Sequence, residues 1–259
     1  MTRKLLTSAI GAGCAAWLLA ALLHFAFIQE YILLGEEYET GAAVHYAGVP
    51  AADDAAAPAE AGHDHSATTE EHSHDGAEAA HDHDHGDEGE VSTFTRNLWT
   101  TVFYGVVYVG YGLILVAGFG IATVYGKTIT AREGLLWGLA GCAAFLLAPA
   151  LGLAPELPGT PAADLGERQI WWWGTVIATA LAFGLLAYGR NVVALAVAVV
   201  LLALPHLIGA PELETYAGVA PPEVAGAFSA RVLVVGLAVW AVLGWTAGYI
   251  WAREADTPA

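Results

Sequence analysis

Histidines and carboxylates alternate along one stretch of the chain, residues 63–85, which reads HDHSATTEEHSHDGAEAAHDHDH and holds seven of the ten histidines. Neutral imidazole and carboxylate oxygen suit borderline divalent metals such as zinc, nickel and cobalt. At pH 7 most exposed histidines are neutral and free to ligate. The stretch therefore predicts metal capture, with the candidate ligands His63, His65, His72, His74, His81, His83, His85, Asp82 and Asp84.

The densest part of this stretch is 81–85, in which three histidines alternate with two aspartates. In an extended chain, alternate side chains share a face, so the three imidazoles line up opposite the two carboxylates. A polar tract that only keeps a loop solvated is the alternative interpretation. Disordered acidic segments that have no ligand to bind rarely contain many histidines, so the histidine content favours metal binding. These ligand types do not identify the metal.

The charge of the chain is concentrated around this stretch. The sequence has 259 residues, 56% of them hydrophobic, and a net charge of -17, and 17 of its 26 acidic residues lie between Glu30 and Glu90. Only nine Lys and Arg residues occur, and they are scattered, which argues against a nucleic-acid partner. Gly126-Lys127-Thr128 resembles the end of a phosphate-binding loop, but Gly120 stands one residue too far upstream, so ATP binding by this chain is not expected.

The rest of the chain consists mainly of apolar runs near the length that crosses a bilayer. The first is too long for the core of a signal peptide, so we expect it to remain as a helix. The sequence predicts an all-α integral membrane protein with about six transmembrane helices, at Leu5–Ile28, Leu98–Tyr125, Glu133–Leu153, Gln169–Tyr188, Val192–Ile208 and Phe228–Trp251.

Three parts follow from this pattern. Residues 1–40 form the first transmembrane helix and an outer mouth, residues 41–97 a His-rich acidic loop, and residues 98–259 the five-helix remainder. The loop lacks the apolar residues needed to offset its chain entropy, so we expect disorder in the absence of metal. With a cytoplasmic N-terminus, most basic residues fall inside the cell. This distribution predicts a multi-pass protein of the cell membrane with both termini cytoplasmic and the loop outside.

Internal repetition suggests three copies of a helical hairpin. Residues 13–20, GCAAWLLA, recur as GCAAFLLA at 141–148. Arg96, Arg168 and Arg231 are each expected to stand just before a helix that runs back inward. Parallel repeats of this kind occur in some transporters. Glycines within the predicted spans are expected to be close-packing positions between helices. They are Gly105, Gly110, Gly112, Gly118 and Gly120 in the second run, and the pairs Gly134/Gly138 and Gly244/Gly248. The three tryptophans Trp171–Trp173 are expected to anchor a span end at the membrane interface.

Polar side chains near the outer ends of the spans are candidates for a cation path, because such groups are costly at membrane depth. The alternative interpretation is structural: His24 is a packed, hydrogen-bonded histidine at the membrane interface, and Glu156 and Glu212 cap or solvate the outer loops. The candidate path residues are His24, Glu30, Glu156, Asp164, Arg168, His206 and Glu212.

Several longer motifs resemble the CbtA family of probable cobalt transporter subunits. They lie at residues 134–141, 147–153, 155–159, 162–172 and 204–211. The resemblance implies a multi-pass subunit that brings cobalt into the cell for cobalamin synthesis, together with a small single-helix CbtB-type partner that carries its own histidines. Members of this family are described with five spans, whereas six apolar runs occur here.

The function expected from residues and resemblance together is uptake of a divalent transition metal through a non-enzymatic membrane subunit, with the external loop capturing the ion. Cobalt is the expected cargo, and nickel or zinc remains open. The alternatives are a zinc or nickel transporter or exporter, and a metal-sensing membrane protein without transport. A membrane metalloenzyme would need several intramembrane histidines at helical spacing, and only His24 and His206 are available.

Overall fold

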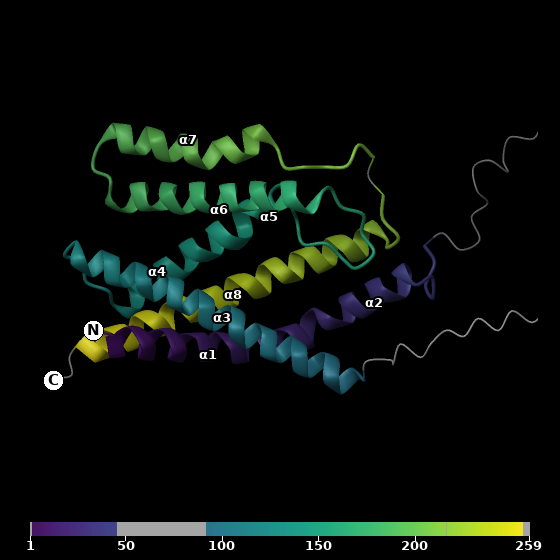
Figure 1. Ribbon diagram of the computed structural model, residues 1–259, viewed down its shortest axis with the longest axis horizontal. Helices are drawn as coiled ribbons and strands as arrows, with labels where there is room; N and C mark the ends of the chain where they lie inside the picture. Colours follow the sequence, from purple (N-terminus) through teal and green to yellow (C-terminus); the bar gives the residue numbers. More distant parts are fainter. Residues whose placement is uncertain (1, 46–91, 216, 256–259) are drawn as a thin grey trace, which may run out of the picture.

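A computed structural model describes residues 2–45, 92–215 and 217–255. Within those ranges the chain is all-helical, which confirms the predicted class, and it contains no strand. The helices are α1 (Thr2–Phe27), α2 (Gln29–Glu39), α3 (Thr93–Val124), α4 (Ala131–Cys142), the π-helical turn η2 (Ala143–Leu147), α5 (Ala148–Ala150), α6 (Leu165–Tyr188), α7 (Val192–Ile208) and α8 (Pro222–Ala255) (Figure 1).

Five helical segments of the described chain are long and apolar enough to cross a membrane: Thr2–Phe27, Thr93–Val124, Ala131–Ala150, Leu165–Tyr188 and Pro222–Glu254. The predicted span Val192–Ile208 forms α7 with those bounds, but it has 17 residues. A helix of that length rises about 26 Å, which is less than the ~30 Å hydrocarbon core. A six-span topology therefore depends on α7 and stays a prediction.

The helices extend beyond the apolar runs. α3 begins at Thr93, inside the segment predicted to be a loop, because the Ser92 hydroxyl caps it and accepts a hydrogen bond from the Thr95 amide at 3.2 Å. α8 begins at Pro222, before the apolar run that starts at Phe228, and α2 was not predicted as a separate helix. Caps and intrahelical hydrogen bonds continue a helix into water, whereas hydropathy detects only its apolar part.

α1, α3, α4 and α8 form a tightly packed group. α8 contacts the other three helices, and α1 also packs along α3. Ala9, Ala12, Ala16 and Ala20 make one small, buried face of α1. This face lets α3 approach so closely that a Cβ at Gly112 would lie 2.6 Å from the carbonyl oxygen of Ala9. Small residues on facing helices are the usual means of close association in membranes.

The predicted glycine pairs form the contact between α4 and α8. A Cβ added at Gly134 or at Gly244 would lie 2.4 Å from the carbonyl oxygen of the other glycine. A Cβ at Gly138 would meet the carbonyl oxygen of Trp240, and one at Gly248 that of Thr130, also at 2.4 Å. The prediction of close packing is therefore confirmed at these four glycines and at Gly112, whereas it is wrong at Gly110, where a Cβ would meet no atom within 4 Å. The two backbones touch directly along this contact.

α6 and α7 form a second, antiparallel pair beside this group (Figure 1). α6 meets α4, η2 and α5, whereas α7 contacts only α6 among the described helices. The third hairpin expected from the repeats would pair α7 with α8. This pairing is wrong, because these two described helices do not contact each other. α8 packs instead on α1 and α4, and residues 209–221 connect α7 to α8 in the sequence. The prediction that an arginine stands just before each returning helix is also wrong, because Arg96, Arg168 and Arg231 lie within α3, α6 and α8.

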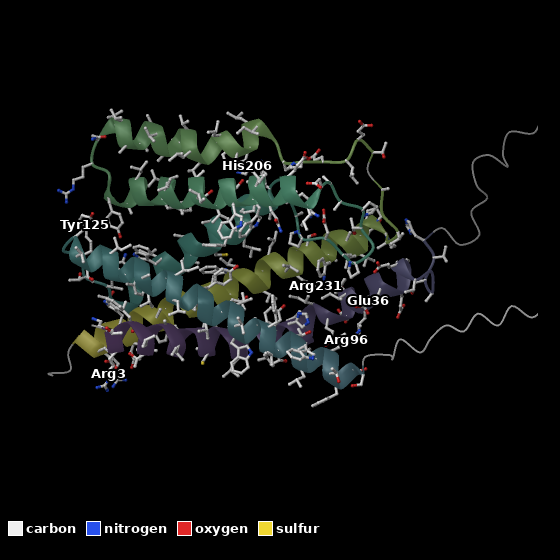
Figure 2. All side chains as sticks on the ribbon, viewed as in Figure 1. Arg3, Glu36, Arg96, Tyr125, His206 and Arg231 are labelled. Carbon is white, nitrogen blue, oxygen red and sulfur yellow. The ribbon has the colours of Figure 1, made fainter. Side chains whose placement is uncertain are left out.

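The molecule has two distinct ends. At the first, which we call the terminal end, α1 begins and α8 ends, and the Lys4 ammonium lies 4.3 Å from the centre of the Trp251 ring. At the opposite end, which we call the loop end, lie His45 and Ser92, the described residues nearest to the segment 46–91. Figure 2 shows Arg3 and Tyr125 toward the terminal end and Glu36, Arg96 and Arg231 toward the loop end.

Candidate metal-transport site

The predicted capture ligands lie outside the described residues. This applies to His63, His65, His72, His74, His81, His83, His85, Asp82 and Asp84. Within the described ranges, no three His, Cys, Asp or Glu side chains come close enough together to hold a metal ion. Six of the seven predicted path residues fall instead into three separate polar clusters, and their local geometry shows which structural roles they already have.

The first cluster lies in the connection from α5 to α6. An oxygen of Glu156 lies 2.7 Å from a guanidinium nitrogen of Arg168, and both side chains are partly exposed. Asp164 is the N-cap of α6, where its Oδ1 accepts a hydrogen bond from the Glu167 amide at 3.1 Å. The Ser229 hydroxyl of α8 donates to the carbonyl oxygen of Pro155 at 2.6 Å and holds the connection against α8. Asp164 is thus a helix cap, and the charge of Glu156 is balanced by Arg168.

The second cluster surrounds His206 near the end of α7. Its half-buried ring meets the ring of Trp171 edge-on, with centres 6.0 Å apart. The indole of Trp171 donates a hydrogen bond to the carbonyl oxygen of Pro205 at 3.0 Å. α7 ends at Ile208, its C-cap Gly209 has a φ of 86° that favours glycine, and Glu212 is exposed beyond it. This geometry fixes the backbone beside His206 while its imidazole stays partly accessible.

Trp171 departs from its predicted role. We expected all three adjacent tryptophans to be membrane-interface anchors, but Trp171 is 8% exposed and joins α6 to α7. Trp173 is 53% exposed, as an anchor would be. Successive residues on a helix point about 100° apart, so three adjacent tryptophans cannot share one environment.

The third cluster lies between α1 and α3. His24 is buried, and its Nδ1 is 3.0 Å from the hydroxyl of Tyr104. Tyr104, Tyr108 and Tyr111 follow at helical spacing on α3, with adjacent ring centres 6.0 and 6.1 Å apart. His24 is therefore a packed, hydrogen-bonded histidine in this structure, as the structural alternative expects. The hydrogen bond at Nδ1 orients the ring, and Nε2 is the other ring nitrogen that can form a hydrogen bond or bind a metal.

Sequence reasoning missed this row of tyrosines. The signal that could have found it is tyrosine at positions i, i+4 and i+7 within a membrane-length apolar run, because those positions share one helix face. It also missed the pair of Glu36 with Arg96, whose charged atoms are 3.1 Å apart and join α2 to α3. Glu30, the remaining path candidate, is exposed in the first turn of α2.

His24 and His206 belong to different parts of the fold. His24 lies in the contact of α1 with α3, whereas His206 lies on α7, which neither of those helices touches. The two imidazoles thus do not form one site. A cation path through the described helices would use one side or the other, and this separation makes the two sides distinguishable by mutation.

Comparison with known proteins gives one match. A family model described as "Probable cobalt transporter subunit (CbtA)" matches residues 2–252, nearly the whole chain. No curated protein and no solved structure matches. The match spans α1 to α8 and includes all the polar clusters described above.

Proposed function

The chain belongs to the CbtA family of probable cobalt transporter subunits, and on that premise we propose that it is the membrane-spanning subunit of a cobalt uptake system, in which the His-rich segment captures the ion outside the cell and the helices pass it inward. Membership in a transporter-subunit family favours a role without catalysis. The cargo would be a divalent metal ion, with cobalt named by the family description and nickel and zinc as the competing cargoes.

The observation that supports inward transport is the unequal distribution of basic residues between the two ends of the molecule. Six of the nine basic residues belong to segments at the terminal end (Figure 1): Arg3, Lys4, Lys127, Arg132, Arg190 and Arg253. Basic residues favour the cytoplasmic side of a cell membrane. Because His45 and Ser92 lie at the loop end, this orientation would put the His-rich segment outside and both termini inside.

We assign the first intramembrane step to the side of the fold that carries His206. Its imidazole is partly accessible beside a fixed backbone turn. Glu156, Asp164, Arg168 and Glu212 would surround the outer mouth on that side. Glu156 could ligate a metal only if its pair with Arg168 opened. Glu30 and His24 would form the competing route along α1 and α3.

The energy for inward movement would come from an ion gradient, the membrane potential or a partner. An inside-negative potential favours inward transfer of a dication by about 4.6 kcal/mol per 100 mV, twice the single-charge value. The family description as a subunit implies a partner, which we propose to be a small single-helix CbtB-type chain. The His-rich segment would not select cobalt, because nickel, copper and usually zinc bind such ligands at least as well.

Replacing His206 by alanine is expected to lower cobalt uptake at least about tenfold, since the first ligand of the membrane path is lost and each 1.4 kcal/mol changes a rate tenfold. The measurement is metal-resolved uptake of cobalt, nickel and zinc into vesicles that hold this chain, with and without its partner. Leu207→Ala is the matched control, because Leu207 is the next residue and is 81% exposed. Undiminished uptake with His206→Ala and a large loss with His24→Ala would move the path to the α1–α3 side.

A sidedness experiment tests the direction independently. A cysteine at Thr68, within the His-rich segment, is expected to react with a membrane-impermeant maleimide in intact cells. A cysteine at Thr128, in the connection from α3 to α4 at the terminal end, is expected to react only after the membrane is permeabilised. The native Cys14 and Cys142 lie within helices and set the background. The reverse labelling pattern would exclude uptake by this mechanism and favour export. Vesicles without any flux would favour a metal sensor.

A further inference from the structure

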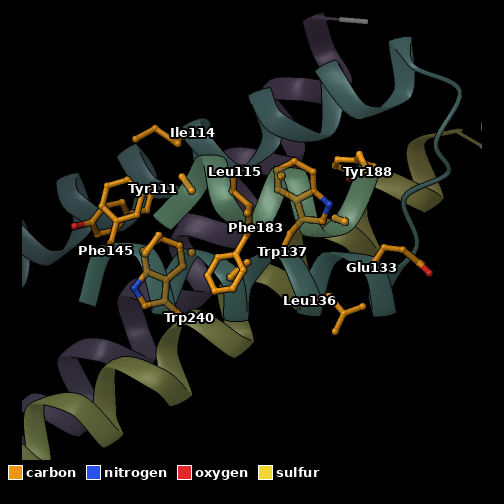
Figure 3. A pocket seen from close by; sticks show the side chains of 16 residues that line it. Tyr111, Ile114, Leu115, Glu133, Leu136, Trp137, Phe145, Phe183, Tyr188 and Trp240 are labelled. Atoms are coloured by element: carbon orange, nitrogen blue, oxygen red, sulfur yellow. The ribbon is translucent and has the colours of Figure 1, made fainter. Parts of the chain in front are cut away.

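A cavity of about 370 Å³ lies between α6 and the packed group of helices. Figure 3 shows Glu133 and Tyr188 at one end of it and Tyr111, Phe145 and Trp240 at the other. Ile114 and Leu136 also line the cavity and are 57% and 56% exposed. The cavity is therefore an apolar groove that opens onto the surface of the helices, and in a membrane protein that surface faces lipid.

The groove follows from the way α6 meets the other helices. α4 lies directly on α8 through its glycines and then continues through the π-helical turn η2 to α5. α6 contacts η2 and α5, and the ring of Phe145 in η2 lies 6.0 Å from the ring of Trp172 in α6. Toward the terminal end, α6 separates from α3 and α4, and the groove fills the wedge between them (Figures 1 and 3). Gly184 of α6 leaves this space open, because a Cβ there would meet no atom within 4 Å.

Water and a helix are both poor occupants of this groove. A buried water needs two to four polar partners, and the side chains in the middle of the groove, Trp137 and Phe183 among them, are apolar or aromatic. A helix about 10 Å across occupies roughly 400 Å³ per turn, and a membrane span has about five to six turns. The groove could thus hold about one turn of a partner helix, whereas a flexible hydrocarbon chain can enter it from the bilayer.

A cation, Lys127, lies at the terminal end of the groove. The Lys127 ammonium lies 5.4 Å from the centre of the Tyr188 ring, which lines the groove. Arg132 precedes Glu133 in the first turn of α4, and Arg190 follows Tyr188 by two residues. The carboxylate of Glu133 already accepts a hydrogen bond from the Thr130 amide as part of the α4 cap. Lys127 thus stands at this end of the groove, Arg132 and Arg190 are adjacent to lining residues in the sequence, and the carboxylate that lines the groove already has a structural role.

From this combination we propose that the groove binds one acyl chain of an anionic phospholipid, whose phosphate lies among Lys127, Arg132 and Arg190. Basic groups between transmembrane helices, beside an apolar surface, are the setting in which anionic lipid headgroups bind. The bound chain fills the wedge between α6 and α4 and supports the α6–α7 pair, which has little other contact with the packed group. This site is independent of the metal that the protein carries.

The test uses the full-length protein purified in detergent, with native mass spectrometry to count retained phospholipids. The wild-type protein is expected to retain one phospholipid, and Gly184→Phe, which fills the groove, is expected to reduce its occupancy at least tenfold. Gly174→Phe is the matched control. Gly174 lies on the same helix and also has open space at its Cβ, but it does not line the groove. Equal retention by the two variants would overturn the proposal.

A second measurement tests the charged end without filling the groove. Thermal stability of the lipid-stripped protein is compared after adding mixed micelles of phosphatidylglycerol or of phosphatidylcholine. The wild-type protein is expected to be stabilised more by the anionic lipid. The triple variant K127Q/R132Q/R190Q is expected to lose that preference. A preference unchanged by the triple variant, or a retained polypeptide in place of a lipid, would contradict an anionic phospholipid in this groove.

Discussion

Leucine in place of Gly244 is expected to prevent the protein from reaching its folded state. The Cβ of any side chain at this position would lie 2.4 Å from the carbonyl oxygen of Gly134 and 2.6 Å from the Cα of Gly138. Both atoms belong to the α4 backbone and cannot rotate away as a side chain could. α4 and α8 must therefore separate, which also loosens the contact of α8 with α1. Overpacking typically costs about 1–3 kcal/mol, and we expect more than about 3 kcal/mol for leucine here.

The measurement is the fraction of monodisperse protein after solubilisation and its unfolding temperature in detergent. Gly244→Ala should give an intermediate result, with a cost of about 2 kcal/mol, because only the methyl group must be accommodated. Gly110→Ala is the matched control, since a Cβ at Gly110 meets no atom within 4 Å. Alanine there should be neutral or stabilise by up to about 1 kcal/mol. If the Gly244 and Gly110 variants were equally stable, the direct backbone contact of α4 with α8 would be disproved.

Deleting residues 62–86 is expected to raise the cobalt concentration for half-maximal uptake about tenfold and to leave the maximal rate nearly unchanged. The segment is proposed to hold metal near the outer mouth, so it raises the local concentration without taking part in passage through the helices. Saturating metal replaces that local supply. The measurement is uptake as a function of free cobalt, by cells or by vesicles that hold the protein in one orientation.

A chain with the seven histidines of residues 63–85 replaced by alanine separates metal binding from segment length. We expect this variant to behave like the deletion, because both remove the imidazoles. A similar loss of uptake at limiting and at saturating cobalt would contradict the capture role and would indicate a structural role for the segment. Normal uptake by both variants at every concentration would remove the segment from the transport mechanism.

Local features of the sequence predicted the membrane class, the approximate positions of the helices and the family. The apolar runs correspond to the helices because each run is a property of one segment in contact with lipid. The glycine pairs were predicted as packing positions for a similar reason, since spacing alone puts them on one helix face. The family match confirms the resemblance that rested on motifs around Gly134, Pro149 and His206.

Which helices pack together could not be read in this way. The repeated motifs suggested that α7 pairs with α8, but α8 packs on α4 and α1, and α7 lies on α6. Likewise, nothing in the local sequence distinguishes Trp171, buried against α7, from the exposed Trp173. The lipid-facing groove beside Gly184 arises from the angle between α6 and α4, which no single segment encodes.

The sequence by itself determined that this chain is a helical membrane protein with a segment rich in His, Asp and Glu and a family-specific set of motifs, because hydropathy and side-chain chemistry are properties of each residue. Only the tertiary structure decided that His24 and His206 lie in separate regions and that Arg168 neutralises Glu156. Those relationships depend on which helix faces are small enough to touch. Close backbone contact at the glycines of α4 and α8 brings residues together that are about a hundred positions apart in the chain.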